Sequence, residues 1–227
     1  MLMPDPYLNK RGEMVEKQLI ARGIRDERVL NAMRTIPRHQ FVSAALAHLA
    51  YRDCPLPIGE NQTISQPYIV ALMTELLQLQ GHERVLEVGT GSGYQAAVLC
   101  ELSAYVYTVE RSIILAERAG GLLARLGYDN IDVHVGDGSQ GLADMAPFDA
   151  IIVTAGAPAL PGPLASQLNP NGGRLVIPIG KQSSQYLHCI IREGDNWRTE
   201  RVLAVRFVPL IGRYGFKFRD DSPEASV

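Results

Sequence analysis

The chain has 227 residues, of which 46% are hydrophobic and 20% charged, and this length and balance are typical of one α/β domain rather than two. The formal net charge of −2 offers no basic field for a phosphate backbone, so we expect no nucleic-acid partner. The three cysteines and five histidines show no disulfide or metal-ligand spacing, which indicates reduced thiols, a cytoplasmic location and no metal site.

The first part of the chain divides into two segments. Residues 1–13 contain two prolines and no apolar periodicity, and we expect a loose extension there. Residues 14–60 are predicted to be a helical N-terminal part, broken at Gly23 and at Ile36-Pro37, that ends in the turn-rich connection CPLPIG at 54–59. The chain starts without the apolar core of a signal peptide, and no apolar run is long enough to cross a bilayer, so we expect no membrane association.

The stretch GENQTISQPYIVALMTELLQL, residues 59–79, combines two patterns. After Pro67 the apolar residues follow helical spacing, which predicts a helix that begins near this proline. Before it, five polar residues, Asn61, Gln62, Thr63, Ser65 and Gln66, crowd the approach to the helix. They form either a turn with Ser65 as the helix N-cap or the edge of a site, and the local pattern fits both.

Beyond this helix, short apolar runs alternate with helical stretches at 94–102 and 112–126, which indicates β-α-β units. We expect a doubly wound, mostly parallel, seven-stranded Rossmann-like sheet within a core at 61–212, the last two strands forming a hairpin at one edge, and a C-terminal tail at 213–227. The predicted strands are residues 84–89, 105–110, 131–135, 148–153, 173–178, 186–191 and 198–207.

A glycine-rich loop, EVGTGSGY, follows the first strand of this sheet. Gly89, Gly91 and Gly93 allow the backbone to turn tightly and to approach a ligand closely. The second strand ends in Glu110, 21 residues after Gly89, where a carboxylate can accept hydrogen bonds from ribose hydroxyls. A tight turn without a ligand would explain the glycines but not the acids, so the pattern predicts a nucleoside site.

Two nucleoside cofactors fit such a loop. A nicotinamide dinucleotide expects G-x-G-x-x-G facing a pyrophosphate, whereas this loop reads G-x-G-x-G, with Glu87 two residues before the first glycine. That carboxylate would repel a pyrophosphate and suits the ammonium and sulfonium of S-adenosylmethionine. Asp137, after the third strand, either accepts a hydrogen bond from the adenine amino group or caps a turn.

At this point the chain resembles the protein-L-isoaspartate O-methyltransferases. VLEVGTGSGYQAAVL, TVER, VGDGSQG, FDAIIVTAGAP and LNPNGGRLVIPIG occur in the family's order, and TISQPY and VRFVPL make the match specific. The similarity runs from about residue 14 to 210, and the extension and tail depart from it. It implies Ser65 as the active-site serine. The run VRFVPL at 205–210 alternates enough to be a strand, and it is either an ordinary edge strand or a strand whose far end, at Val208 and Pro209, binds the substrate main chain. The predicted cofactor-binding residues are Thr63, Ile64, Ser65, Glu87, Gly89, Thr90, Gly91, Glu110, Asp137 and Gly138.

The resemblance also implies a reaction. Methyl would pass from S-adenosyl-L-methionine to the free α-carboxylate of an L-isoaspartyl residue, leaving S-adenosyl-L-homocysteine, and the ester would close to a succinimide and begin repair. An α-carboxylate has a pKa of about 3.3–3.7, so it is already ionised and needs no general base. The expected partners are isoaspartyl-containing proteins and peptides, bound by a monomer.

Other methyltransferase classes fit less well. A nucleic-acid amino-methyltransferase would carry an Asp/Asn-Pro-Pro-aromatic segment after the fourth strand, where this chain has TAGAP at 154–158, and a cytosine-carbon enzyme needs Pro-Cys where Cys54-Pro55 is reversed. A small-molecule methyltransferase stays an alternative because a fold does not set its substrate. A non-catalytic S-adenosylmethionine-binding module would be expected to lose TISQPY, which is present.

Overall fold

The computed structural model describes residues 5–217 of the chain. Of the predicted tail at 213–227, residues 213–217 are described and residues 218–227 lie outside the described residues. Its described beginning turns back onto the core, because Phe216 N donates to Leu210 O at 2.7 Å. Among the described residues, no helix is long and apolar enough to cross a membrane.

The chain begins with helix α1 (Leu8–Met14), which continues through a π-helical turn (Val15–Leu19) and a 3-10 turn (Ile20–Arg22). The predicted loose extension is therefore wrong for residues 8–13. Arg11 is 6% exposed, donates to Arg34 O at 2.5 Å and forms an ion pair with Asp5 at 2.9 Å. The inward face of α1 thus carries an arginine that apolar periodicity counts as polar, and this hides the helix from pattern reading.

The rest of the N-terminal part holds α2 (Glu27–Thr35), capped by the Asp26 carboxylate, and 3-10 turns at Arg38–Phe41 and Ala44–Leu49. Where the sequence indicated only a turn-rich connection, β1 (Leu56–Gly59) and β2 (Gln62–Ile64) form a two-stranded hairpin. Its turn places Glu60 and Asn61 at φ values of 51° and 54°. Pro57 within β1 and Pro55 directly before it obscured this strand, because a proline is tolerated mainly in an edge strand.

The predicted seven-stranded sheet is confirmed, with strand order β5-β4-β3-β6-β7-β8-β9. The strands from β5 to β7 are parallel, and β8 and β9 add an antiparallel hairpin at one edge. Strand order reverses between β3 and β6, and ligands bind at such a switch point, beyond the carboxyl ends of the strands. The strands are β3 (Arg84–Val88), β4 (Tyr105–Glu110), β5 (Ile131–Val135), β6 (Ala150–Val153), β7 (Asn171–Lys181), β8 (Ser184–Glu193) and β9 (Asn196–Val205).

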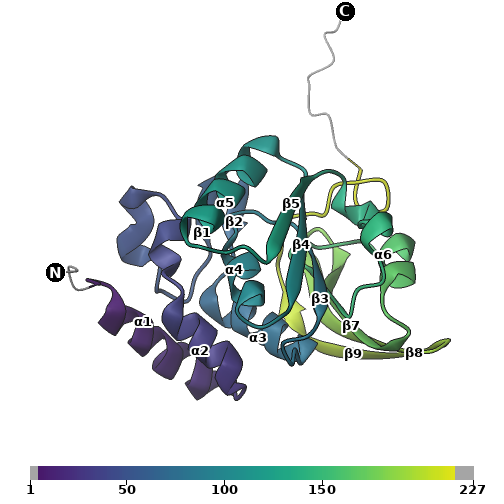
Figure 1. Cartoon of the computed structure of the whole chain (residues 1–227), viewed down its shortest axis with the longest axis horizontal. Helices are drawn as coiled ribbons and strands as arrows, with labels where there is room; N and C mark the ends of the chain where they lie inside the picture. The colour runs from purple at the N-terminus through teal and green to yellow at the C-terminus, as the bar shows by residue number, and fades with distance from the viewer. Residues whose placement is uncertain (1–4, 218–227) are drawn as a thin grey trace, which may run out of the picture.

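Helices cover the two faces of this sheet unequally. On one face Val85, Val106 and Ile152 pack in a core shared with α3, α4 and α5, whereas Leu86 and Ile151 face the opposite core, which includes α6. Burial on both faces is what parallel strands require. The N-terminal helices and the β8–β9 hairpin lie at opposite ends of the molecule (Figure 1). The helices are α3 (Pro67–Leu77), α4 (Tyr94–Cys100), α5 (Ile113–Arg125) and α6 (Gly162–Gln167).

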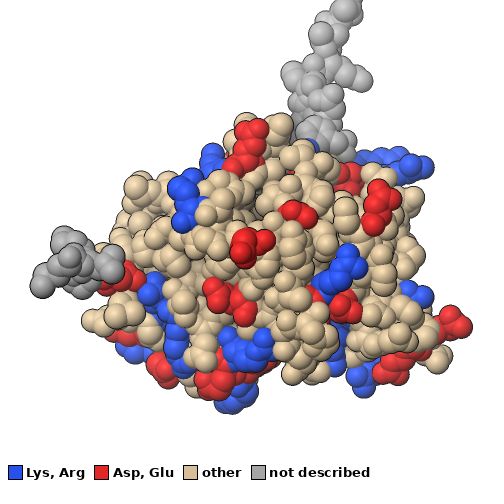
Figure 2. Space-filling view, in the orientation of Figure 1, with Lys and Arg blue, Asp and Glu red and all other residues tan. Residues whose placement is uncertain are grey.

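The charged side chains are distributed without large blocks of one sign on the face in Figure 2. Lys and Arg side chains alternate with Asp and Glu along its lower rim, and uncharged residues cover much of its centre. This pattern agrees with the small formal net charge of −2.

Candidate active site

A pocket opens at the switch point, where the ends of β3, β4 and β6 meet the loop before α3 and the segment after β9. It encloses about 880 Å³ including its mouth, within the ~300–1,000 Å³ of small-molecule sites. Ten of the twelve predicted site residues line it: Thr63, Ile64, Ser65, Gly89, Thr90, Gly91, Glu110, Gly138, Val208 and Pro209. The structure thus brings together residues that lie up to 146 positions apart in the sequence, from Thr63 to Pro209.

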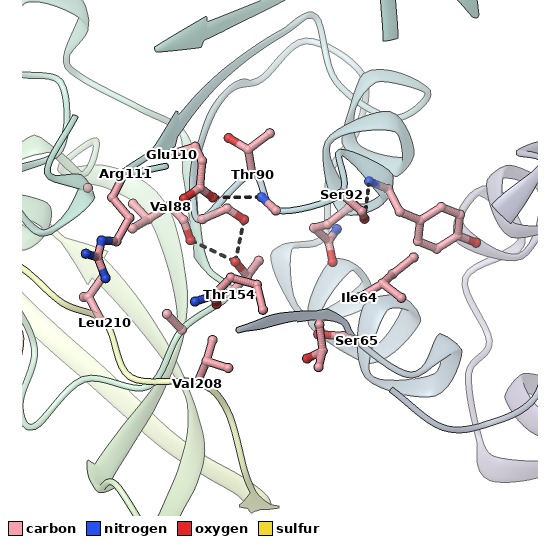
Figure 3. A pocket seen from close by; sticks show the side chains of 18 of the residues that line it. Ile64, Ser65, Val88, Thr90, Ser92, Glu110, Arg111, Thr154, Val208 and Leu210 are labelled. Carbon is pink, nitrogen blue, oxygen red and sulfur yellow. Dashed lines mark hydrogen bonds between the residues drawn. The ribbon is translucent and has the colours of Figure 1, made fainter. Parts of the chain in front are cut away.

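The glycine loop forms one wall of the pocket. Gly89 has a φ of 98°, and a Cβ atom added to it would lie 2.4 Å from Thr154 Oγ1. That hydroxyl lies 2.6 Å from Gly89 O and 3.0 Å from Val88 O, so it joins the ends of β3 and β6 (Figure 3). Sequence reasoning missed Thr154, although its place directly after the fourth strand was the available signal.

Glu110 holds this loop from the end of β4. Its carboxylate accepts hydrogen bonds from Gly91 N and Ser112 N, each at 2.9 Å, and the residue is 5% exposed. Each carboxylate oxygen has further lone pairs. Glu110 can therefore hold the loop and still accept hydrogen bonds from ligand hydroxyls in the pocket that it lines.

Glu87 lies behind the pocket wall. It is fully buried and does not line the pocket, so a contact with the cofactor's cationic end stays a prediction. Thr108 Oγ1 donates to its Oε2 at 2.6 Å, and its Oε1 has no partner. Burial raises the pKa of Glu87 to about 8. The reason is strand alternation: Glu87 shares the face of Val85, which packs toward the helices, whereas Val88 lines the pocket.

Asp137 also lies outside the pocket lining, although its neighbour Gly138 is part of it. The Asp137 carboxylate caps a 3-10 turn through Ser139 N at 3.0 Å and accepts from Arg213 N at 2.8 Å. Partial burial works to raise its pKa, but these bonds and one from Gln140 outweigh burial and lower the pKa. The structure therefore shows the capping role, and a contact with adenine stays a prediction.

Ser65 does not cap α3. The N-cap residue is Gln66, and no side chain caps this helix, whose first residue is Pro67. The capping interpretation of Ser65 is therefore wrong. Its side chain lines the pocket and makes no hydrogen bond with any described residue, while its carbonyl accepts from Arg38. Figure 3 shows Ser65 facing the space that Thr154 and Val208 border from other elements.

The segment after β9 is partly paired with the loop after β6 and leaves one main-chain group unpaired. Val208 O accepts from Gly156 N at 2.8 Å, and Leu210 N donates to Gly156 O at 2.7 Å. The N–H of Val208 itself donates to no described residue. This leaves one main-chain donor beside Ser65, available to an extended ligand.

A second hollow continues from the pocket toward the surface. We call it the groove, and it shares Ser65, Thr154 and Val208 with the pocket, among other residues. Its other lining residues include Arg22, Gln66, Gln182 and the run Leu203–Pro209. The pocket and the groove thus meet at Ser65, so a ligand in one can reach a ligand in the other.

Comparison with known proteins agrees with this geometry. A family model described as protein-L-isoaspartate(D-aspartate) O-methyltransferase matches residues 9–215. The chain is 56% identical over 211 residues to protein-L-isoaspartate O-methyltransferase 1 of Syntrophobacter fumaroxidans, covering 93% of this chain and 98% of the relative. It is 57% identical over 210 residues to the protein-L-isoaspartate O-methyltransferase of a Roseiflexus species, covering 92% and 95% of the two chains.

Two solved structures are similar over most of the chain. A protein-L-isoaspartate O-methyltransferase superposes with a TM-score of 0.82 at 31% identity, covering 90% of this chain and 67% of that one. A Plasmodium falciparum protein provisionally assigned the same activity was solved in complex with S-adenosyl-L-homocysteine. It superposes with a TM-score of 0.77 at 29% identity, covering 88% and 98% of the two chains.

Proposed function

This chain belongs to the protein-L-isoaspartate(D-aspartate) O-methyltransferase family, and we propose how its residues serve that reaction. It is an enzyme that transfers a methyl group from S-adenosylmethionine to the free α-carboxylate of L-isoaspartyl residues in damaged proteins and peptides. The resulting ester closes to a succinimide without enzyme, and part of the succinimide hydrolyses to normal aspartate. The product of the enzyme therefore starts a repair.

The pocket takes the cofactor in this proposal. The tight fit of Gly89 against Thr154, where a Cβ atom would collide, keeps the backbone of the loop open to a ligand. Glu110 would accept hydrogen bonds from the ribose hydroxyls, and the main chain of the glycine loop would hold the methionine part. Bound there, S-adenosylmethionine supplies an electrophilic methyl group on a sulfonium. The residues proposed to hold it are Thr63, Ile64, Gly89, Thr90, Gly91, Glu110 and Gly138.

The observation that carries the proposal is the meeting of the pocket and the groove at Ser65. The Ser65 hydroxyl donates to one oxygen of the isoaspartyl carboxylate and leaves the other oxygen to attack. The Val208 N–H, free in this structure, donates to a main-chain carbonyl of the substrate, with Pro209 packing beside it. Main-chain contacts suit an enzyme that accepts damage in many sequences.

The residues at this junction act by orientation. The attacking carboxylate is already ionised at neutral pH, so no residue needs to remove a proton. Positioning two reactants in line can lower a barrier by roughly 7–11 kcal/mol in favourable cases. The walls formed by Ile69, Thr154 and Val208 also exclude water from the line between the two ligands.

A methyl-transfer assay that compares an isoaspartyl peptide with its aspartyl twin tests the function. We expect transfer to the isoaspartyl peptide alone, because only there does the main chain run through the β-carboxyl and leave the α-carboxylate free. Equal methylation of both peptides, or turnover only of a small carboxylic acid, would contradict the proposal. The second result would support the small-molecule alternative.

A proline substitution tests the main-chain contact. Val208→Pro removes the N–H, and we expect the KM for the peptide to rise roughly 3- to 10-fold, the worth of one hydrogen bond. The affinity for S-adenosylhomocysteine, measured by calorimetry, should stay unchanged. Val208→Ala is the matched control because it keeps the N–H. Equal loss of peptide and cofactor binding in Val208→Pro would remove Val208 from the substrate site.

We also propose that the enzyme works in the cytoplasm as one monomeric domain that binds neither nucleic acid nor membrane. The scattered free thiols and the interspersed surface charges support this proposal. Light scattering coupled to size-exclusion chromatography tests the oligomeric state, and a mass near 25 kDa is expected for a chain of 24.9 kDa. A mass twice as large would contradict it.

A further inference from the structure

Arg38 is an unusual arginine, because its side chain is entirely buried (0% exposed). Its Nε donates to Ala50 O at 2.7 Å and its Nη2 to Ser65 O at 2.6 Å. The third nitrogen, Nη1, is buried without any partner. The guanidinium lies over the ring of Tyr94, with Cζ 4.7 Å from the ring centroid.

The charge of this group has no counter-ion. The other buried arginine, Arg11, forms an ion pair with Asp5, but no carboxylate of the described residues pairs with Arg38. Burial lowers the pKa of Arg38, yet a guanidinium remains protonated in proteins. An unpaired buried charge is costly. The two carbonyl oxygens accept hydrogen bonds from the guanidinium, but they carry no full negative charge and leave Nη1 without a partner.

The position of this cation relative to the site is well defined. Two of the residues that Arg38 contacts, Ser65 and Tyr94, line the pocket, whereas Ala50 and Arg38 itself do not. The charge therefore lies one layer behind the wall at the junction of the pocket and the groove. Low-dielectric surroundings there weaken screening, so the field of the cation reaches the junction.

We propose that Arg38 is a positioning residue whose buried cation attracts the isoaspartyl carboxylate, and whose Nη2 holds the Ser65 main chain against that carboxylate. This inference rests on the proposed function. Arg38 touches neither substrate nor cofactor, and it acts through Ser65 and through its field. The carboxylate of the bound substrate is the counter-ion that Arg38 lacks in the folded protein.

The sign of the effect on kinetics follows from the reaction. The carboxylate bears a full negative charge before transfer and none after it, so the cation stabilises the bound substrate more than the transition state or the ester. Removing the charge should therefore act mainly on the KM for the peptide and less on kcat. The neutral methyl ester should bind with little dependence on Arg38, which favours its release.

Arg38 could instead only fasten two loops through the carbonyls of Ala50 and Ser65. The two roles differ in one measurable ratio, the affinity for an isoaspartyl peptide divided by the affinity for its uncharged twin with an α-carboxamide. A charge raises this ratio. A fastening role changes both affinities equally and leaves the ratio unchanged.

The test measures both affinities by calorimetry in the presence of S-adenosylhomocysteine. The variants are Arg38→Gln, which removes the charge, and Arg38→Lys, which keeps it. Arg28→Gln is the matched control, because Arg28 also donates to two main-chain carbonyls, Leu79 O at 2.6 Å and Leu102 O at 3.1 Å, but lies outside the pocket and the groove.

We expect the carboxylate peptide to bind wild type at least 10-fold more tightly than its carboxamide twin. The ratio should fall below 3-fold in Arg38→Gln and stay near the wild-type value in Arg38→Lys and Arg28→Gln. A folded Arg38→Gln protein that keeps the wild-type ratio overturns the inference, and so does an Arg38→Lys protein that loses it as fully as Arg38→Gln.

Wild type alone provides a second test, which does not depend on the folding of a variant. A fully buried charge is little screened, so the ratio should change less than twofold between about 0.05 and 0.5 M salt. Collapse of the ratio in high salt would assign it to exposed arginines and overturn the inference. If wild type does not methylate isoaspartyl peptide, the proposed function fails, whereas methylation with an unchanged Arg38→Gln ratio removes only the role of Arg38.

Discussion

The two walls of the pocket are built differently. The cofactor wall consists of residues 88–92, 109–111 and 154, at the ends of three neighbouring parallel strands, and each stretch continues directly from a buried strand. The substrate wall consists of residues 65–66, directly after β2, and residues 205–211, from the end of the edge strand onward, which are about 140 positions apart in the chain.

The two walls also differ in how many of their polar groups already form hydrogen bonds within the protein. In the cofactor wall Glu110 and Thr154 already bond to the loop. In the substrate wall the Ser65 hydroxyl and the Val208 N–H bond to no described residue. A wall whose polar groups are satisfied holds one ligand in a fixed pose, whereas free donors on a second wall accept main chains of many sequences. Substitutions should therefore separate the two binding functions.

Gly89→Ala should produce the largest effect, and it should break the cofactor wall. The φ of 98° and a Cβ atom 2.4 Å from Thr154 Oγ1 combine backbone strain with overpacking, which together cost about 2–6 kcal/mol. Calorimetry should show S-adenosylhomocysteine binding weakened by at least 30-fold. Adding Thr154→Ala should restore part of it. Gly12→Ala, in open space within α1, is the control, and wild-type binding by Gly89→Ala would contradict the expectation.

Ser65→Asp should break the substrate wall instead. It places a second carboxylate against that of the substrate, and like charges a few ångströms apart repel by about 1–4 kcal/mol, so the KM for the peptide should rise roughly 5- to 1,000-fold. The melting temperature should not change, because Ser65 caps no helix. Ser65→Ala should cost less than about 0.5 kcal/mol of stability and a smaller part of the rate. Full activity of folded Ser65→Asp would remove Ser65 from the site.

Glu110→Gln should show how much of cofactor binding depends on charge. It keeps the shape of the side chain but loses the ionised acceptor, and hydrogen bonds to a charged group are worth about 1.5–3 kcal/mol. We expect S-adenosylhomocysteine to bind roughly 10- to 150-fold more weakly. The affinity for the peptide, measured at saturating cofactor, should be unchanged. Loss of both affinities together would show that the walls are coupled.

Glu87, buried behind the cofactor wall, gives the folded protein a pH-dependent stability. Burial raises the pKa of Glu87 from an ordinary value of 4.5 to about 8 in the folded state. The folded state therefore keeps its proton to higher pH than the unfolded state, and the contribution of Glu87 to stability falls as the pH rises from about 4.5 to 8. The slope is about 1.4 kcal/mol per pH unit for one proton, which makes at most ~3 kcal/mol between pH 6 and 8. Urea unfolding should show this decline in wild type and a flatter profile in Glu87→Gln. Parallel profiles would contradict it.

The smallest effect concerns the outer end of the substrate wall. Arg22 and Arg206 line the groove, and no Asp or Glu of the described residues does. Acidic residues beside the isoaspartate should therefore bind more tightly. An exposed charge pair is worth about 0.2–1 kcal/mol, so the KM should fall by up to roughly 5-fold. The preference should vanish in 0.5 M salt and shrink in Arg206→Gln. A preference that survives high salt would point to a buried charge instead.

The sequence by itself determined most of the cofactor wall. Apolar runs predict the strands, Pro67 predicts the start of α3, and the glycine loop predicts its own position at the end of a strand. These features are local, because a strand, a helix start and a tight turn each depend on neighbours within a few residues. The order of strands and helices then leaves few parallel topologies to choose from. The same local rules missed α1, whose buried face includes Arg11.

Only the tertiary structure decided which polar groups are already occupied. The sequence indicated Glu87 and Asp137 as cofactor contacts, but neither lines the pocket, and Thr108 and Arg213, distant in the chain, donate to their carboxylates. Whether a carboxylate faces the pocket depends on the side of the strand on which it lies and on the residues that pack against it, and the motif does not set either. For the same reason the counterpart of Ser65, the buried Arg38, lies 27 positions earlier and could not be read from the spacing.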